Sequence, residues 1–380
     1  MCGIAGILNL NSSPIQNLDC SLRIMNKLQK HRGPDGEGSW THREKFLGLS
    51  HVRLSVIDLN TGQQPMVSDN KNVISYNGEI YNFKELRKQI GESKFSTTSD
   101  TEVILKAYER WGDDCISKFR GMFAFALWDE NKSSLFCARD RFGIKPFYYT
   151  VVNEVFYCAS EIKALLPFVE QIDTDIDSLN DYLTFQFTLG DKTLFKGIKK
   201  LEPGHMLTIK NGQISVQKYW EVYYELDFGH TESFFVERVK DLMDESISLH
   251  MRSDVPVGAY VSGGRDSSIV AALATKVERT DFKAFTGKFS FGEGYDESNY
   301  ARDLANQYSI DLHELDIQSG DFVSSIGKVI YHLDEPVAGP GSFPQYEISG
   351  LASQHRKVVL GGQGGDEIFS GYKYNNFAHY

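Results

Sequence analysis

The second residue of the chain is a cysteine, placed directly behind the initiator methionine in the opening MCGIAGI. Aminopeptidases remove methionine when the next residue is small, and Cys2 would then carry both a thiol and a free α-amine. Such an amine has an ordinary pKa of about 7.7–8.0, so part of it is neutral near pH 7 and can accept the thiol proton. The chemistry that this arrangement would perform is attack on an amide carbonyl with release of ammonia. The alternative is a tolerated surface cysteine.

A glycine-rich turn in the second half is the next feature whose residue types could take part in chemistry. In PVGAYVSGGRDSSIVAALA (256–274), an apolar strand runs through a polar turn into a helix. Glycines let the backbone approach a ligand, and hydroxyls with the first N–H groups of a helix face an anion. The GxxxxGK[ST] and GxGxxG patterns are absent, which argues against kinase-like and Rossmann phosphate sites. A helix N-cap with flexible glycines is the alternative.

A second loop of the same kind lies near the end of the chain. In KVVLGGQGGDEIFSGY (357–372), an apolar strand is again followed by glycines and then by two carboxylates. Carboxylate oxygens are hard donors suited to Mg²⁺ when the ion bridges phosphate groups. The two loops together favour a nucleotide-phosphate site.

The first half of the chain must position Cys2. Helices are predicted over 18–31, with Leu18, Leu22, Met25 and Leu28 on one face, and over 100–112. Strand-like runs follow in GMFAFALWD, SSLFCARD, KPFYYTVV and EVFYCAS, and HMLTIKNGQISVQKYW (205–220) predicts a hairpin that turns at Asn211-Gly212. Strands this apolar on both faces indicate sheets sandwiched between layers, hence an α/β sandwich.

The second half has a different pattern. The polar stretch 221–232 is the predicted linker, and it precedes a helix over 234–251 whose inner side we expect to hold Phe235, Val239, Leu242, Met243 and Ile247. From residue 255 the pattern is strand, glycine-rich turn and helix, repeated, which is typical of a parallel nucleotide-binding sheet. We therefore predict two domains, 1–220 and 233–380, joined by 221–232.

Composition narrows the functional class. The chain has 380 residues and a net charge of −11, which argues against broad binding to nucleic acid or anionic membranes. No apolar stretch approaches the roughly 20 residues of a membrane helix, and a signal peptide pattern is lacking. The five cysteines (2, 20, 115, 137 and 158) are scattered, with no CxxC pair. A cytoplasmic protein without a zinc site is expected.

Further motifs in the first half carry a family resemblance. HRGPDGEG (31–38), HVRLSVIDLNTGQQP (51–65), YNGEIYN (76–82) and TTSDTEVIL (97–105), with MCGIAG at the start, resemble in order and spacing the glutaminase domain of class II glutamine amidotransferases. These are N-terminal-nucleophile hydrolases. The resemblance covers about residues 1–220 and implies an αββα sandwich.

The resemblance assigns a role to each matching residue. Cys2 matches the nucleophile, and Arg53 matches the residue that grips the glutamine α-carboxylate through its guanidinium fork. Glu79 and Asp100 match the acidic pair that holds the α-ammonium. The side chain of Asn77 and the backbone N–H of Gly78 match the oxyanion hole. Taken singly, Arg53 has a surface-pairing interpretation, Asn77-Gly78 a hairpin-turn interpretation and Asp100 a helix N-cap interpretation.

The turn at 262–268 resembles the pyrophosphate loop SGGxDS of the ATP-pyrophosphatase family, whose members split ATP into AMP and pyrophosphate. That resemblance implies Mg²⁺ ligation by Asp266 and Asp366. It places the following residues at the ATP pocket: Tyr260, Val261, Ser262, Gly263, Gly264, Asp266, Ser267, Ser268, Gly287, Gly361 and Gly362.

A glutaminase followed by such a domain resembles the glutamine-hydrolysing asparagine synthetase family over the whole chain. The implied substrates are glutamine, ATP with Mg²⁺, and a carboxylate, for which we expect aspartate. Family analogy also suggests a homodimer and a dry ammonia passage.

Several departures bear on the acceptor and on completeness. Arg265 stands where the family has leucine, and Gln363 stands where it has glutamate. The loop HLDEPVAGPGSFPQY (332–346) is shorter than in typical members and lacks their arginine. The chain stops soon after Asp366, which suggests a fragment or an incomplete synthetase half.

Three alternatives remain: the same chemistry on a uronic-acid sugar or peptide carboxylate, a bare glutaminase with an inactive second half, and a non-catalytic binding protein. A β-lactam-forming relative is disfavoured because Cys2 is kept, and enzymes with isomerase or phosphoribosyl domains are excluded by the 262–268 loop.

Overall fold

The computed structural model describes residues 1–278, 280–290, 294, 296–336, 339 and 341–371. It divides into two compact units, one formed by 1–224 with 333–338 and the other by 225–332 with 339–380. Residues 337, 338 and 340 of the 332–346 loop, and the end of the chain from 372, lie outside the described residues. Each unit is presented by itself.

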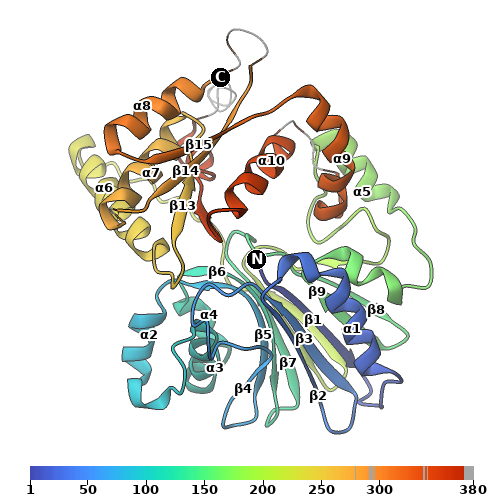
Figure 1. Cartoon of the computed structure of the whole chain (residues 1–380). Helices are drawn as coiled ribbons and strands as arrows, with labels where there is room; N and C mark the ends of the chain where they lie inside the picture. The colour runs from blue at the N-terminus through green and yellow to red at the C-terminus, as the bar shows by residue number, and fades with distance from the viewer. Residues whose placement is uncertain (279, 291–293, 295, 337–338, 340, 372–380) are drawn as a thin grey trace. The chain divides into compact units, whose positions relative to one another are not determined.

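The first unit contains two six-stranded sheets (Figure 1). The order in the first sheet is β10 (Lys199–Lys200), β8 (Tyr148–Val152), β9 (Val155–Ala159), β1 (Gly3–Asn9), β3 (Leu47–Arg53) and β2 (Gly36–Thr41). The order in the second is β12 (Gln213–Lys218), β11 (His205–Lys210), β7 (Ser134–Arg139), β6 (Gly121–Asp129), β5 (Val73–Ile80) and β4 (Met66–Val67). All of these strand pairs are antiparallel.

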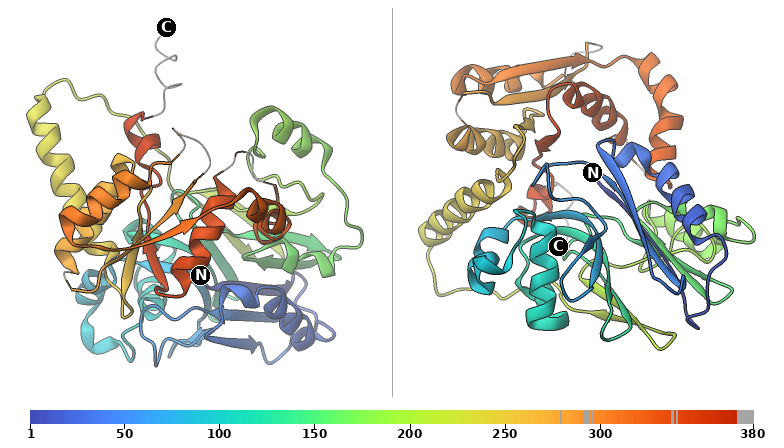
Figure 2. Two further views of the ribbon diagram at one scale, coloured as in Figure 1. Left: turned by 45° about the horizontal axis from the view of Figure 1, so that its top comes forward. Right: turned by 60° about the horizontal axis from the view of Figure 1, so that its bottom comes forward.

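Helices cover the outer face of each sheet, as Figure 2 also shows. α1 (Leu18–Leu28) packs on the first sheet, with Leu18, Leu22 and Met25 buried against Ile7. α2 (Phe83–Ile90) and α3 (Asp100–Trp111) pack on the second. The short α4 (Cys115–Lys118) and α5 (Ile176–Phe185) complete the helices. The predicted αββα sandwich is confirmed.

Strand β6 explains why the sandwich forms. Its Phe123, Phe125 and Leu127 are buried on the helix side, whereas Ala124 and Ala126 are buried in the core between the two sheets. A strand with apolar residues on both faces needs a layer on each side. The predicted hairpin at Asn211-Gly212 is also confirmed, because both residues adopt positive φ (51° and 75°), as a two-residue primed turn requires.

The second unit has a parallel four-stranded sheet in the order β15 (Asp311–Asp316), β14 (Lys283–Lys288), β13 (Val257–Tyr260) and β16 (Val358–Leu360). Its helices are α6 (Glu232–His250), α7 (Arg265–Val277), α8 (Ser298–Tyr308), α9 (Ser319–Leu333), α10 (Ser342–Ser353) and α11 (Gly365–Phe369). Ala259, Ala271, Ala284 and Ala301 form the centre of one core between sheet and helices. The predicted α/β domain with a parallel sheet is confirmed.

The prediction for the buried face of α6 is partly wrong. Ile247 is buried and Met243 packs against the core, but Phe235, Val239 and Leu242 are 40%, 37% and 42% exposed. α6 packs on α7, and the buried residues of α6 are Ile247 and Leu249 in its last turn. The sequence period predicts one buried stripe along α6, but among the described residues only its C-terminal part, at Met243 and Ile247, packs against the core.

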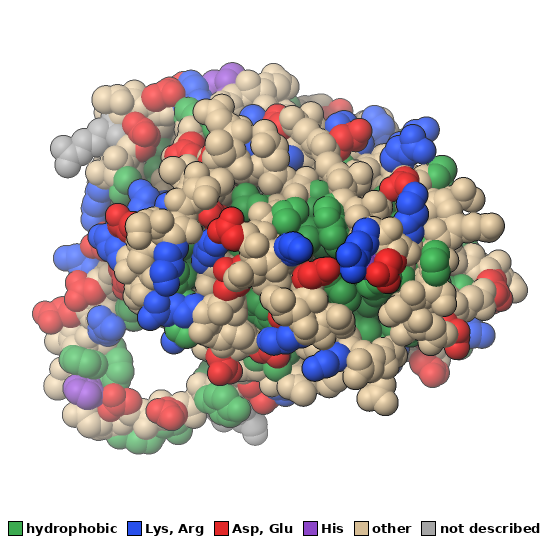
Figure 3. Space-filling model, turned by 90° about the horizontal axis from the view of Figure 1, so that it is seen from below, with side chains coloured by type: hydrophobic (Ala, Val, Ile, Leu, Met, Phe, Trp, Pro, Cys, Tyr) green, Lys and Arg blue, Asp and Glu red, His purple; other side chains and the backbone are tan. Residues whose placement is uncertain are grey.

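The surface agrees with a mixed-charge protein. Figure 3 shows acidic and basic side chains interspersed over the face drawn, with apolar side chains between them. Among the described residues, none of the helices combines the length and the hydropathy needed to cross a bilayer.

Candidate functional site

Cys2 lies immediately before β1, and the backbone that follows β3 touches its thiol. The N–H of Leu54 donates to Sγ at 3.4 Å, and Sγ lies 3.6 Å from the Leu54 carbonyl oxygen. Burial raises the pKa of the thiol, and the hydrogen bond with Leu54 opposes that rise. A thiol in these surroundings needs a base to become a nucleophile.

Arg53 is the last residue of β3 and is 9% exposed. Its guanidinium donates to the backbone carbonyls of Ile57, Asp58 and Leu59. The surface-pairing interpretation is wrong, because these acceptors belong to a loop that wraps the buried guanidinium. To bind a glutamine carboxylate, the guanidinium would have to exchange some of these carbonyl acceptors for the carboxylate oxygens. The carboxylate-gripping role therefore stays a prediction.

Asn77 and Gly78 lie inside β5, not in a hairpin turn. A Cβ on Gly78 would come within 2.2 Å of the Met122 carbonyl oxygen on β6, so only glycine fits this close approach. Asn77 is 1% exposed, and among the described residues its Nδ2 has no hydrogen-bond partner. Burying an amide donor without a hydrogen-bond partner costs about 1–3 kcal/mol of folding free energy, unless a ligand oxygen accepts its hydrogen bond.

Asp100 is buried at the start of α3, where it accepts hydrogen bonds from the Tyr76 hydroxyl (2.8 Å) and the Ile80 N–H (3.0 Å). The N-cap interpretation is wrong: the cap is Ser99, whose Oγ accepts from the Thr101 N–H. Burial raises the pKa of Asp100 to about 6, although these hydrogen bonds oppose the rise. Glu79 is on β5, and its charge acts on Tyr76, on Cys2 and on Lys145.

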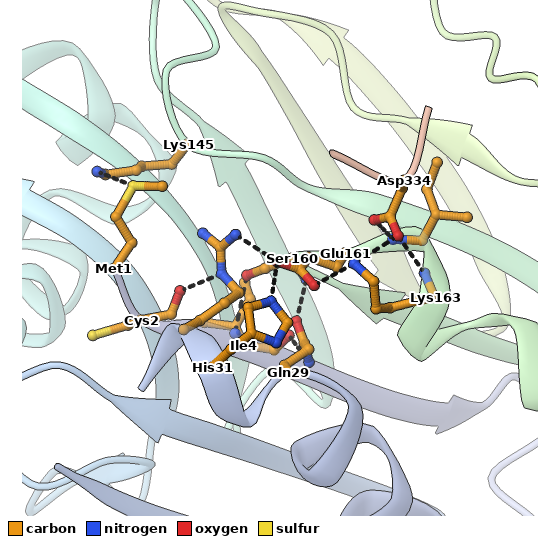
Figure 4. A network of polar contacts seen from close by, with 12 residues as sticks. Met1, Cys2, Ile4, Gln29, His31, Lys145, Ser160, Glu161, Lys163 and Asp334 are labelled. Carbon is orange, nitrogen blue, oxygen red and sulfur yellow. Dashed lines mark hydrogen bonds and ion pairs between the residues drawn. The ribbon is translucent and has the colours of Figure 1, made fainter. Parts of the chain in front are cut away.

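A chain of ionic contacts extends from Cys2 through the first unit, and Figure 4 shows it. Arg32 Nε donates to the Cys2 carbonyl oxygen at 2.9 Å, and its NH1 lies 3.0 Å from Glu161 Oε1. Glu161 Oε2 pairs with Lys163 Nζ at 2.6 Å, and Lys163 pairs with Asp334 at 2.8 Å. Burial alone would raise the pKa of Glu161, but its His31 hydrogen bond and the two cations lower it to about 2.

Asp334 also accepts hydrogen bonds from the N–H groups of Ile162 and Lys163. We expect Asp334→Asn to lower the free energy of unfolding of the first unit by about 3 kcal/mol, because it leaves a buried ammonium partly unpaired. All four tryptophans (40, 111, 128 and 220) lie in this unit, so their fluorescence during urea denaturation measures the loss. Asp191→Asn is the matched control, since its exposed pair with Lys199 contributes about 0–1 kcal/mol. Equal losses of unfolding free energy in the two variants would contradict a stabilising role for the buried Lys163–Asp334 pair.

In the second unit, the turn after β13 has the geometry expected of an anion loop. Gly263 adopts φ 88°, and Ser262 and Ser267 join their hydroxyl groups at 3.1 Å. Gly264 is the N-cap of α7, and it supplies no side chain to satisfy the first helical N–H groups. These N–H groups favour an anion.

The two glycine-rich loops lie against one another, as joint Mg²⁺ ligation by Asp266 and Asp366 would require. A Cβ on Gly362 would lie 2.5 Å from the Ser267 nitrogen, and one on Gly365 would lie 2.2 Å from Asp266 Oδ2. Asp366 follows Gly365 in α11. Among the described residues no group of three or more metal-ligating side chains occurs. Two carboxylates nevertheless suit Mg²⁺, which takes its remaining ligands from water and phosphate.

The other residues predicted at the ATP pocket occupy varied environments. Tyr260 bonds the Ser349 hydroxyl at 2.8 Å, and Val261 is buried. Gly287 has a packing reason to be glycine, because a Cβ there would meet Ile317 and Ile348 at 3.0 Å. Ser268 lies in the first turn of α7, and Gly361 directly follows β16. Their nucleotide roles stay predictions. Arg265 and Gln363 are both exposed.

Two family models match the chain: a glutamine amidotransferase domain over residues 1–220 and asparagine synthase over 238–380. A glutamine-hydrolysing asparagine synthetase of Bacillus subtilis is 37% identical over 378 residues, covering 98% of this chain and 59% of the relative. A putative asparagine synthetase of Methanocaldococcus jannaschii is also 37% identical, covering 98% of this chain and 76% of its own length. The chain belongs to the glutamine-hydrolysing asparagine synthetase family. It spans about three-fifths of the length of the Bacillus relative.

Among solved structures, a glutamine phosphoribosylpyrophosphate amidotransferase of B. subtilis aligns with 74% of this chain and 65% of its own. The identity is 18% and the TM-score is 0.42. The family assignment rests on the sequence relatives.

Sequence motifs did not reveal two cations beside Cys2. Arg32 lies in HRGPDGEG, where the resemblance assigns no role to the arginine, and Lys145 opens the strand-like run KPFYYTVV, which carries no chemical signal. Lys145 is 4% exposed. A buried lysine outside any motif cannot be recognised before the fold is known.

Proposed function

We propose that the chain hydrolyses glutamine at Cys2 and passes the ammonia to an adenylated carboxylate, with aspartate as the acceptor and asparagine, AMP and pyrophosphate as products. The observation that carries the proposal is the Asn77 amide. It is a buried donor with no partner among the described residues. Its strand, β5, also carries Glu79, whose charge acts on the Cys2 thiol. An oxyanion formed at Cys2 would supply the acceptor that this donor needs.

In the glutaminase reaction, the α-amine of mature Cys2 accepts the thiol proton and Sγ attacks the side-chain carbonyl carbon of glutamine. The Asn77 amide and the Gly78 N–H stabilise the oxyanion. The carbon–nitrogen bond then breaks, and the proton held by the amine goes to the departing nitrogen, giving ammonia and a thioester. Water hydrolyses the thioester to glutamate and restores the thiol.

In the second unit, ATP would place its phosphates at the Ser262–Ser268 turn and the start of α7. Asp266 and Asp366 would hold Mg²⁺, which neutralises phosphate charge when bound. The acceptor carboxylate oxygen attacks the α-phosphorus and pyrophosphate leaves. The ammonia nitrogen then attacks the acyl carbon, AMP leaves, and a proton is lost to solvent.

The setting we propose is the cytoplasm, because all five cysteines are free in the structure. We propose no nucleic-acid or membrane partner, given the net charge of −11. A homodimer is proposed by analogy with relatives.

The proposal is tested by incubating the protein with glutamine, ATP, Mg²⁺ and a panel of carboxylates, while glutamate and pyrophosphate are measured separately. Pyrophosphate release that depends on aspartate supports the proposal. Release that depends on a sugar or peptide carboxylate corrects the acceptor. Glutamate release without pyrophosphate release would mean that the chain is a glutaminase only. If neither glutamate nor pyrophosphate is formed, the assignment as an enzyme is contradicted.

The raised pKa of Asp100 predicts a pH-dependent affinity for glutamine. Only the ionised carboxylate attracts the α-ammonium, so below about pH 6 the affinity is expected to fall by up to about tenfold per pH unit. Calorimetric titration of Cys2→Ala with glutamine measures the dissociation constant without turnover. Adding Asp100→Asn should weaken binding at pH 8 and remove the dependence. A flat profile for Cys2→Ala alone would argue against contact between Asp100 and the ammonium.

A further inference from the structure

Lys145 is a buried cation next to the reactive end of the chain. It is 4% exposed, and its Nζ lies 3.1 Å from the sulfur of Met1, as Figure 4 shows. Among the residues that the structure describes, no carboxylate lies within ion-pair distance of this ammonium. A thioether is a weak, neutral acceptor, so the contact compensates little of the cost of burying the charge.

The turn that carries Lys145 is held firmly. The Asp140 carboxylate accepts from the N–H groups of Phe142, Ile144 and Lys145, and also from Phe123 on β6. Arg139 donates to the Lys145 carbonyl oxygen at 2.8 Å. The backbone of Lys145 is therefore fixed relative to β6, and its side chain is directed to the chain start.

The surroundings of the terminal amine already disfavour its charged form. With Met1 present, burial first, and then the charges of Arg32 and Lys145, lower the pKa of the α-amine to about 5, against the opposing effect of Cys2 and Asp35. Glu79 and Asp140 are the carboxylates that act on Lys145 itself. Removal of Met1 takes away the sulfur that Lys145 contacts and moves the amine onto Cys2.

We propose that Lys145 keeps the α-amine of mature Cys2 unprotonated at neutral pH, so that this amine is ready to take the thiol proton. The inference rests on the proposed glutaminase function. Lys145 acts through space on the amine alongside Arg32, whose charge has the larger effect there, and in this proposal it does not touch the glutamine. A buried cation next to the chain start disfavours a second positive charge on the amine, which gives the burial of Lys145 a functional reason.

The test is the pH profile of kcat/KM for glutamine hydrolysis, measured on protein whose loss of Met1 has been verified by mass. Without the cation the amine pKa rises, so in Lys145→Met the acid limb should move to higher pH by about one unit. Lys145→Arg should keep the wild-type limb. The control Lys106→Met removes a largely buried cation of α3 that pairs with Asp69, and it should also leave the acid limb unchanged.

An unmoved acid limb in Lys145→Met would overturn the inference, as would a change confined to KM at every pH, because that would mean substrate contact. A second measurement needs no turnover. Formaldehyde condenses with an N-terminal cysteine when the neutral amine forms an imine with loss of water and the thiol adds to it. The pH midpoint of this reaction should rise by the same amount in Lys145→Met, and an equal midpoint would contradict the inference. Absence of glutamine hydrolysis in the wild type would instead refute the glutaminase function.

Discussion

Cys2→Ala is expected to lower glutamine hydrolysis by about 10⁴-fold or more, because removing a nucleophile eliminates the covalent pathway. Under the proposed function, pyrophosphate release with ammonium salts as nitrogen donor, in the presence of ATP and the acceptor, should persist, since the second reaction takes its nitrogen as ammonia. The measurement is glutamate release with glutamine as donor, alongside pyrophosphate release with either donor.

Cys20→Ala is the matched control, because Cys20 is an exposed cysteine on α1 with no part in the site. It should leave both activities at the wild-type level. Glutamine-driven turnover retained by Cys2→Ala would show that another group attacks the amide.

Asp266→Asn is expected to have the opposite pattern. Loss of one of two carboxylates suited to Mg²⁺ should reduce pyrophosphate release by about 10²-fold or more, as several kcal/mol of charge stabilisation at the phosphates disappear. Glutamine hydrolysis should remain, because Cys2 and its neighbours are unchanged. Separate assays of the two products measure the split.

Asp303→Asn serves as the control, since Asp303 is an exposed carboxylate on α8. Wild-type pyrophosphate release by Asp266→Asn would show that Asp266 does not act at the phosphate site. Loss of both activities in Asp266→Asn, with the control intact, would show that the two reactions depend on one another more than we propose.

The architecture was predictable because its signals are local. Each strand of the first unit with apolar residues on both faces requires two covering layers, and the alternation of Phe123, Ala124, Phe125 and Ala126 serves both. The turn at Asn211-Gly212 and the strand–glycine–helix pattern around 257–277 are equally local. How far α6 is covered depends on elements distant in sequence, and there the prediction partly failed.

The residues of the candidate site also divide into those that local sequence motifs reveal and those that only the fold reveals. Cys2, Asn77, Gly78 and the glycines of the two loops stand in motifs whose residue types already imply chemistry. Lys145 stands in no such motif, and its importance comes from burial beside Met1. The N-cap alternative for Asp100 is wrong because Ser99, one residue earlier, is the cap, and neighbouring polar residues at a helix start cannot be told apart from sequence alone.

The central claim is that the mature chain starts at Cys2 and that its thiol is the nucleophile. Mass spectrometry of the purified protein before and after reaction with a diazoketone analogue of glutamine tests it most directly. The account predicts that Met1 is absent and that a single adduct forms on Cys2, with simultaneous loss of glutamine hydrolysis. Glutamine hydrolysis by protein in which every molecule retains Met1, or an adduct on any other residue, would contradict it.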